Sequence, residues 1–402
     1  MTTPIIMPKL NDSNIGCAVR VWCDAECGEL ADFTHPYYPD YDYFNTVQSE
    51  EIDRLCNGTG IVYDNSAKAN SWDVSGVKSM AGLFKDHLNC NFEINGWKTG
   101  AVTDMTRMFD GAVAFNQPLD SWQTGSVKTM HGIFSGGNME GLPTKSMAFN
   151  QPLDSWQVSA ATSLGHMFKG ARAFNQNLGS WQTDSVVDMR YLFYEAAAFD
   201  QPLNSWQTGS VVDMGNVFMR ADRFNQPLNS WQTGSVVDMK FLFAYATAFD
   251  QPLNSWQTGS VANFGAMFYT TSYNQPLNSW QMGSATMLGS MFAAADKFNQ
   301  NIDSWQMESV KITQGLFRGA SVFNQNINSW QMGSVRYMNT MFMQATAFSQ
   351  NIDSWQLESV APGGATNMFD GANPGCTSIA TCGNYTTTTT TTTEEPTKPI
   401  TP

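Results

Sequence analysis

The spacing of tryptophan constrains the fold of this 402-residue chain more than any other feature. Twelve of its thirteen tryptophans follow one rule, and most of them lie 25 residues from the next. They are Trp72, Trp97, Trp122, Trp156, Trp181, Trp206, Trp231, Trp256, Trp280, Trp305, Trp330 and Trp355. A period of this length indicates one supersecondary unit per repeat, and each unit buries its apolar face only against its neighbours. The chain is therefore predicted to be a solenoid of about twelve stacked units.

The pattern inside one unit predicts a strand followed by a helix. The apolar residues between 211 and 221 follow a 3-4-3 spacing, which places them on one face of a short helix. Ser210 and Asp213 resemble a capping box, so this helix is predicted to begin near Ser210. Upstream, Trp206 and Thr208 alternate with polar residues, which is typical of a half-buried strand.

These elements predict an α/β solenoid, similar to leucine-rich repeats, in which each turn holds one short parallel strand and one short helix. At roughly 4.8 Å per stacked strand, twelve units make a rod about 55–60 Å long. An insertion of nine residues lies within 136–146, and we expect it to be a surface loop beneath which the tryptophan ladder continues.

The repeat also resembles a known family. The spacing L-x-x-W-x-[TVML]-x-x-V-x-x-M-x-x-x-F-x-x-A-x-x-F-N, found in 203–225, resembles the BspA-like leucine-rich repeat surface proteins. The resemblance is closest to the subgroup with the signature W-x-V-x-x-V-x-x-M-x-x-M-F-x-x-A-x-x-F-N-Q, whose earliest copy here begins at Trp72. It covers roughly residues 70–371 and implies a solenoid fold and a surface-exposed adhesion or binding protein.

The ends of the chain are not repeats. Residues 1–69 are predicted to be an acidic, cysteine-containing cap, because terminal repeats expose apolar edges, and a ligand site is the alternative. The solenoid spans 70–371, and a small cysteine loop follows at 372–385. Residues 386–402 are rich in Thr and Pro, a composition typical of a linker or stalk without a packed core.

Composition and motifs exclude several classes of function. Only 14% of residues are charged and the net charge is −14, so the basic footprint of a nucleic-acid or anionic-membrane binder is missing. No apolar stretch is long enough for a membrane span. Common nucleophile, phosphate-binding and zinc-protease motifs are missing too, so we expect no enzyme, no cofactor and no metal. His131 and His166 are expected to be solvated surface residues.

Cysteines and sequons favour an extracellular or cell-surface location. Six cysteines flank the repeats and are disulfide candidates, with unpaired thiols or metal binding as alternatives: Cys17, Cys23, Cys27, Cys56, Cys376 and Cys382. Glycosylation candidates are Asn11, Asn57 and Asn384. The chain shows no evident signal peptide, so a cytoplasmic location stays open.

Binding is the predicted function, with a protein or a glycan as partner. The predicted site is a polar row beside the buried tryptophans: Ser180, Gln182, Ser205, Gln207, Ser230, Gln232, Ser255 and Gln257. Hydrogen bonds between these glutamines are the structural alternative. A scaffold or spacer without a ligand is the second function. Ice binding is a third, on Thr183, Thr208, Thr233 and Thr258, but these alternate in phase with Trp and are expected to face inward.

Overall fold

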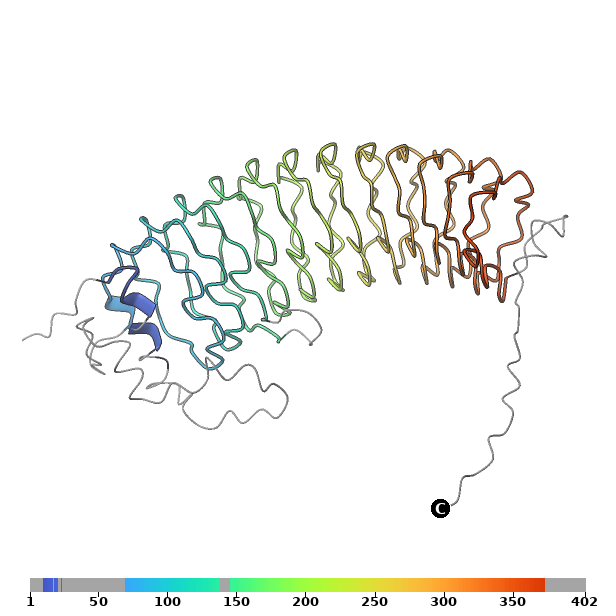
Figure 1. Ribbon diagram of the computed structural model, residues 1–402. Coiled ribbons are helices and arrows are strands. Elements are labelled where there is room, and N and C mark those ends of the chain that lie inside the picture. The colour runs from blue at the N-terminus through green and yellow to red at the C-terminus, as the bar shows by residue number, and fades with distance from the viewer. Residues whose placement is uncertain (1–9, 17, 21–22, 24–68, 138–144, 373–402) are drawn as a thin grey trace, which may run out of the picture.

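The computed structural model describes residues 10–16, 18–20, 23, 69–137 and 145–372. Within these ranges the chain forms a gently curved rod of stacked coils (Figure 1). Regular elements are sparse: the 3-10 helix η1 spans Ala69–Ser71, and residues 15–16, 18–20 and 23 are helical. One parallel bridge joins each coil to the next, through Ser79, Asp104, Thr129, Ser163, Asp188, Asp213, Asp238, Asn263, Met287, Ile312 and Tyr337. The predicted repeat solenoid is therefore present, with fewer regular elements than expected.

The predicted helix does not form. Residues 215–220 are a succession of turns, and the bridge residue Asp213 lies inside the segment that was expected to be helical. The residues expected to cap the helix have other partners. An oxygen of Asp213 accepts the N–H of Gly215 at 2.8 Å, and the hydroxyl of Ser210 donates to the carbonyl of Asp184 in the preceding coil.

Hydrogen bonding between coils explains this difference. The N–H groups of Met214, Asn216 and Phe218 donate to carbonyls in the next coil, at 2.9–3.0 Å. Between them, the N–H of Val217 donates three residues back to the carbonyl of Met214, and the N–H of Gly215 donates to the side chain of Asp213. An α-helix would use all these groups internally and leave nothing to join the coils. A 3-4-3 apolar spacing fits either arrangement, because successive turns of three or four residues also return the chain to the interior.

Three aromatic ladders fill the rod. Neighbouring indoles stack face to face, as for Trp206 and Trp231, whose ring centroids lie 6.4 Å apart at 3°. Each indole N–H from Trp97 onward donates to a carbonyl in the preceding coil, such as that of Leu203 for Trp231 at 3.0 Å. Two phenylalanine ladders lie beside the indoles, and within one coil Phe218 and Phe224 stack at 4.0 Å. These residues are buried, so the core is a continuous column.

Buried polar groups connect the coils along the same column. Thr208 is fully buried; its hydroxyl donates to the carbonyl of Gln232 at 3.0 Å and accepts the N–H of Gln232 at 2.8 Å. The other threonines of this series are buried as well: Thr183, Thr233 and Thr258. Their predicted inward direction is confirmed. No surface array of these four threonines exists on which ice could bind.

The N-terminal segment covers the first coil. Leu10, Ile15 and Val19 are buried, and the N–H of Leu10 donates to the carbonyl of Asp73 at 3.0 Å. The carboxylate of Asp12 accepts the N–H groups of residues 78 and 79 at 2.7 and 3.0 Å. These two bonds lower the pKa of Asp12 below its ordinary value. Asp12 thus supplies to the first coil the acceptors that a preceding coil would have offered.

The insertion leaves the core undisturbed. The N–H of Lys145 donates to the carbonyl of Gly136 at 2.9 Å, which closes the base of the inserted segment. Trp122 and Trp156 flank the insertion in sequence and stack at 6.2 Å and 6°. The ladder therefore continues past the insertion, as expected. Residues 138–144 lie outside the described ranges.

Candidate functional site

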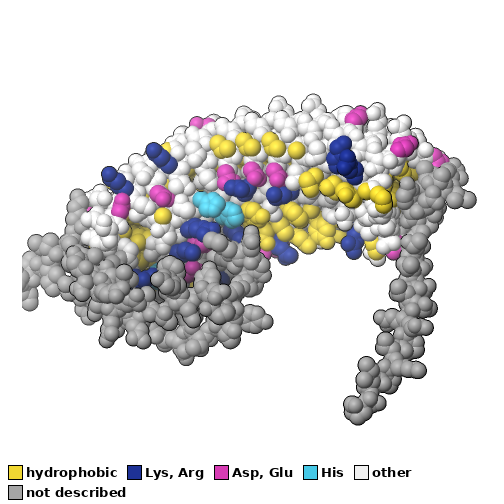
Figure 2. Space-filling model, in the orientation of Figure 1, with side chains coloured by type: hydrophobic (Ala, Val, Ile, Leu, Met, Phe, Trp, Pro, Cys, Tyr) yellow, Lys and Arg dark blue, Asp and Glu magenta, His cyan; other side chains and the backbone are white. Residues whose placement is uncertain are grey.

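One side of the rod carries the side chains that vary most from coil to coil. We call it the ladder face: in each coil it comprises the bridge residue, the residue before it and the turns after it, such as 212–220. Seven large apolar side chains are exposed in the described part of the chain, and six of them lie here: Val187, Val212, Val237, Phe241, Met287 and Tyr337. Figure 2 shows apolar side chains in a band along the rod, beside acidic side chains and histidines.

The backbone of this face contains two left-handed residues per coil, four positions apart except at Gly132 and Gly137. Gly315 and Gly319 occupy them in one coil, with φ of 62° and 70°. Other coils place non-glycine residues there: Tyr191, Glu195, Asn216, Arg220, Phe241, Tyr245, Ala266, Thr270, Ser290, Ala294, Thr340 and Gln344. A residue with a Cβ loses roughly 1–2 kcal/mol in this conformation. Glycine would relieve the backbone at most of these positions, and Tyr191, Phe241 and Tyr245 carry bulky side chains there instead.

A cluster of rings lies at the N-terminal half of the ladder face. His131 and His166 have ring centroids 4.9 Å apart, and His166 stacks on Tyr191 at 4.6 Å. The ammonium of Lys169 lies 5.9 Å from the Tyr191 ring and 5.8 Å from the Tyr194 ring. Both contacts fall within the range of a cation–π interaction. The cluster therefore joins residues of three consecutive coils.

Both histidines are less exposed than the sequence suggested. Burial, together with the charges of His131 and Lys169, lowers the pKa of His166 to about 3. Burial likewise lowers the pKa of His131. Both histidines therefore lie at the surface but are only partly solvated. At neutral pH the two rings are uncharged and part of an aromatic surface.

Acidic residues occupy the bridge positions of the coils next to this cluster. Arg190 lies between two of them, with its guanidinium 2.9 Å from Asp188 and 3.6 Å from Asp213. Burial acts to raise the pKa of Asp188, but its hydrogen bonds to Arg190 outweigh burial and the net pKa is lowered. Burial raises the pKa of Asp213, where the N–H of Gly215 compensates only in part. The carboxylate of Asp188 also accepts a hydrogen bond from the hydroxyl of Ser163 in the preceding coil, at 3.2 Å. The row forms a charged border along the ring cluster.

A second aromatic group lies further along the ladder face. The guanidinium carbon of Arg220 lies 4.5 Å from the centre of the Tyr245 ring, and Tyr245 meets the edge of Tyr269 at 5.2 Å. Phe241 is 38% exposed. Neither group was predicted from the sequence. One signal for them is present: the residues at these positions differ in nearly every repeat, while the packing positions hardly change.

The predicted serine and glutamine residues are exposed, but their serine hydroxyls bond to the backbone and are not free for a ligand. Each of the four serine hydroxyls donates to a carbonyl of the preceding coil, as from Ser205 to Gly179 at 2.7 Å and from Ser255 to Asn229 at 2.7 Å. These serines therefore have a structural role. The side-chain amide of Gln232 packs over Gly209, a position where a Cβ would lie 2.6 Å from its oxygen.

The expected hydrogen bonds between glutamines occur nowhere among the four predicted residues. An amide ladder forms instead at the F-N-Q segment of the repeat. There the amide of Gln226 donates to Asp200 at 2.9 Å, and the N–H of Asn225 donates to the same carboxylate at 3.0 Å. Equivalent bonds recur in the neighbouring coils, for example from Gln251 to Asn225 at 3.1 Å.

A shallow cavity of about 320 Å³ lies at the N-terminal end of the serine and glutamine face. It is lined by Asn70, Asn95, Gly96, Trp97, Lys98, Ser121 and Gln123. This lining contains a single charged residue and no pair of titratable groups that could exchange a proton.

The remaining predicted residues are only partly covered by the structure. Cys23 forms a disulfide with Cys90, a residue inside the repeats that the sequence analysis did not include among its candidates. Asn11 is exposed, and its side chain accepts the N–H of Ser13 at 2.9 Å. The other candidates lie outside the described residues: Cys17, Cys27, Cys56, Cys376, Cys382, Asn57 and Asn384. No helix in the described ranges is long and apolar enough to cross a membrane.

Comparison with known proteins identifies the repeats. The family described as "Mycoplasma protein of unknown function, DUF285" matches in four tandem segments, residues 59–139, 137–215, 201–295 and 271–381. No curated protein and no solved structure matches the chain.

Proposed function

The chain belongs to the DUF285 family of repeat proteins, and on that premise we propose that it is a non-enzymatic binding solenoid whose ladder face recognises a protein partner. One observation carries the proposal. Tyr191, Phe241 and Tyr245 hold bulky side chains at φ of 53–60° on an exposed face, where glycine would relieve the backbone. Strained residues of this kind concentrate at functional sites.

The chemistry of the ladder face favours a protein over a glycan. Energetic hot spots of protein interfaces are enriched in tyrosine, tryptophan and arginine, surrounded by contacts that exclude water. The pair Arg220 and Tyr245 fits this description, and so do Tyr191 and Tyr194 with Lys169 beside them. The exposed valines of three consecutive coils add apolar area to the same face.

We place the protein outside the cell or at its surface. The resemblance to BspA-like leucine-rich repeat surface proteins supports this location. The disulfide between Cys23 and Cys90 supports it too, because disulfides persist in oxidising compartments. The Thr/Pro composition of residues 386–402 fits a stalk that would hold the rod away from a surface.

A matched pair of variants tests the ladder face. The purified chain is measured against arrays of extracellular proteins and of glycans. One variant combines Tyr191→Gly, Phe241→Gly and Tyr245→Gly, which removes three side chains at positions that accept glycine. The control combines Gln182→Ala, Gln207→Ala and Gln232→Ala in the predicted serine and glutamine site. A hot-spot residue contributes about 2 kcal/mol or more, which corresponds to about 30-fold in affinity, so the glycine variant should lose at least about 30-fold.

Each outcome decides between the candidate functions. Loss of protein binding in the glycine variant, with the glutamine variant unchanged, supports the ladder face. The reverse result would move the site to the serine and glutamine face. Glycan binding that survives both variants would contradict the proposal. Binding to no probe would favour the alternative of a scaffold or spacer, in which the rod only sets a distance.

A further inference from the structure

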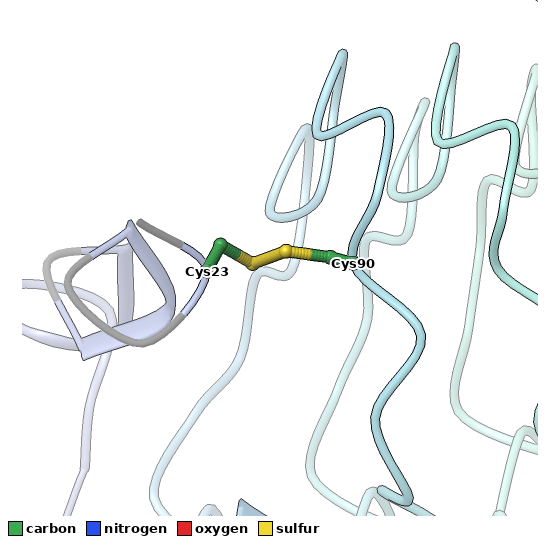
Figure 3. The surroundings of a disulfide bond; sticks show 2 residues. All are labelled: Cys23 and Cys90. Atoms are coloured by element: carbon green, nitrogen blue, oxygen red, sulfur yellow. A yellow bond between two sulfur atoms is a disulfide. The ribbon is translucent and has the colours of Figure 1, made fainter. Parts of the chain in front are cut away.

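Three potential metal ligands meet where the N-terminal segment contacts the first coils. Cys23 follows the helical residues 18–20, and Cys90 and His87 come from the first repeat. Figure 3 shows the two cysteines bridging the N-terminal segment and the coil. The sulfur atoms and a ring nitrogen of His87 all lie within 4.8 Å of one another.

We infer that these three residues bind a divalent metal ion of the zinc class when the cysteines are reduced. Thiolate sulfur and imidazole nitrogen are the donors that zinc prefers, at about 2.3 Å and 2.0–2.1 Å, respectively. Donors already within 4.8 Å need only small movements to reach one central ion. Three protein donors leave a fourth tetrahedral position for water or another ligand.

The surroundings of the site favour a bound ion. Cys23 and Cys90 are 0% and 1% exposed, and His87 is half-buried, so bulk water has little access to the sulfur atoms. His87 and Cys90 are separated by two residues, a spacing common among zinc ligands on one loop. Cys23 lies 67 residues away in sequence. An ion here would therefore fix the cap to the rod, as the disulfide does.

Metal binding and disulfide formation exclude each other at this site. In the reduced state, two thiolates and one neutral imidazole hold the ion. A small-molecule disulfide then oxidises the two thiolates by exchange. One cysteine thiolate attacks a sulfur of the small-molecule disulfide, forms a mixed disulfide and expels the first small thiolate. The second cysteine thiolate then attacks the cysteine sulfur of the mixed disulfide and expels the second small thiolate. The products are the Cys23–Cys90 disulfide, two small thiolates and the released ion.

Titration with Co²⁺ tests this inference on the full chain. The reduced chain should develop the charge-transfer absorption of a cobalt–thiolate site, and Zn²⁺ should displace it. His87→Ala removes one ligand and leaves the cysteines able to pair. Loss of a mere outer-shell partner costs about 10–100-fold in metal affinity, so loss of this direct ligand should cost at least that. His131→Ala, in a histidine remote from the site, should bind Co²⁺ like the parent chain.

Two results would overturn the inference. One is the absence of a cobalt–thiolate band from the reduced parent chain. The other is equal Co²⁺ affinity in His87→Ala and the parent, which would assign the metal to other cysteines. Equal melting temperatures of the oxidised parent and oxidised His87→Ala verify that the variant folds. Cys90→Ser serves as a second variant and should lose both the disulfide and the metal.

Discussion

Comparing the stability of Phe241→Ala with that of Phe241→Gly measures whether the backbone of the ladder face is strained. Phe241 has φ of 53°, whereas Val237, four residues earlier, has no positive φ and donates its N–H to Val212 in the preceding coil. Both side chains are exposed, 38% and 44%. Alanine removes either side chain beyond Cβ, and glycine removes Cβ as well. The difference between alanine and glycine at each position therefore isolates the backbone contribution.

The structure predicts opposite signs at the two positions. At Phe241 a Cβ costs about 1–2 kcal/mol in the left-handed conformation. Glycine itself lowers the free energy of unfolding by about 0.5–1 kcal/mol relative to alanine, because it has more conformational freedom in the unfolded chain. Phe241→Gly should therefore be about 0.5–1 kcal/mol more stable than Phe241→Ala. At Val237 only the second contribution acts, so Val237→Gly should be about 0.5–1 kcal/mol less stable than Val237→Ala.

Hydrogen exchange is the appropriate assay, because long repeat arrays do not always unfold as one unit. Protection of the amides in 237–246 reports the local free energy of opening. Guanidinium denaturation of the whole chain provides a second measurement. Glycine less stable than alanine at both positions would refute the strain argument. It would also remove the observation on which the proposed binding face rests.

Three further predictions follow from the core and the histidine cluster. Trp231→Phe should lower the free energy of unfolding by about 2 kcal/mol in guanidinium denaturation. Loss of the hydrogen bond to Leu203 accounts for about 1 kcal/mol of this decrease, and the cavity left by the smaller ring accounts for about 1 kcal/mol more. A loss below 0.5 kcal/mol, on the order of an exposed substitution, would contradict the importance of the indole bond. Thr208→Val keeps the side-chain shape but leaves the N–H of Gln232 without its acceptor, so exchange of that amide should accelerate and stability should fall by about 1–3 kcal/mol. Unchanged exchange at Gln232 would show that the hydroxyl is dispensable. Because the pKa of His166 is lowered to about 3 from 6.5, the unfolded chain binds a proton that the folded chain rejects, and stability should fall as pH drops from 6.5 towards 3, by at most about 1.4 kcal/mol per pH unit. His166→Asn, which tolerates the left-handed φ of 59°, should flatten this part of the pH profile, and an unchanged slope would place the titration elsewhere.

The sequence alone determined the repeat and its interior. Near-identical units have only one common way to stack, so the recurring tryptophans had to form a ladder. The alternation around Trp206 and Thr208 predicted correctly which side chains point inward, because that pattern is local. The spacing also predicted that the tryptophan ladder continues past the insertion, and the stacking of Trp122 on Trp156 confirms it.

Tertiary structure decided the backbone path, the surface and the cross-link. A 3-4-3 apolar pattern suits a helix and a series of turns equally, and only the carbonyls of the next coil select the turns. The ladder face depends on which residues from different coils lie side by side, as His131, His166 and Tyr191 do, and their distances in sequence do not show it. Cys90 was not among the predicted disulfide candidates because it lies inside the repeats, and its partner, Cys23, lies 67 residues earlier. Each of these features depends on contacts between segments remote in sequence, and local sequence patterns do not predict such contacts.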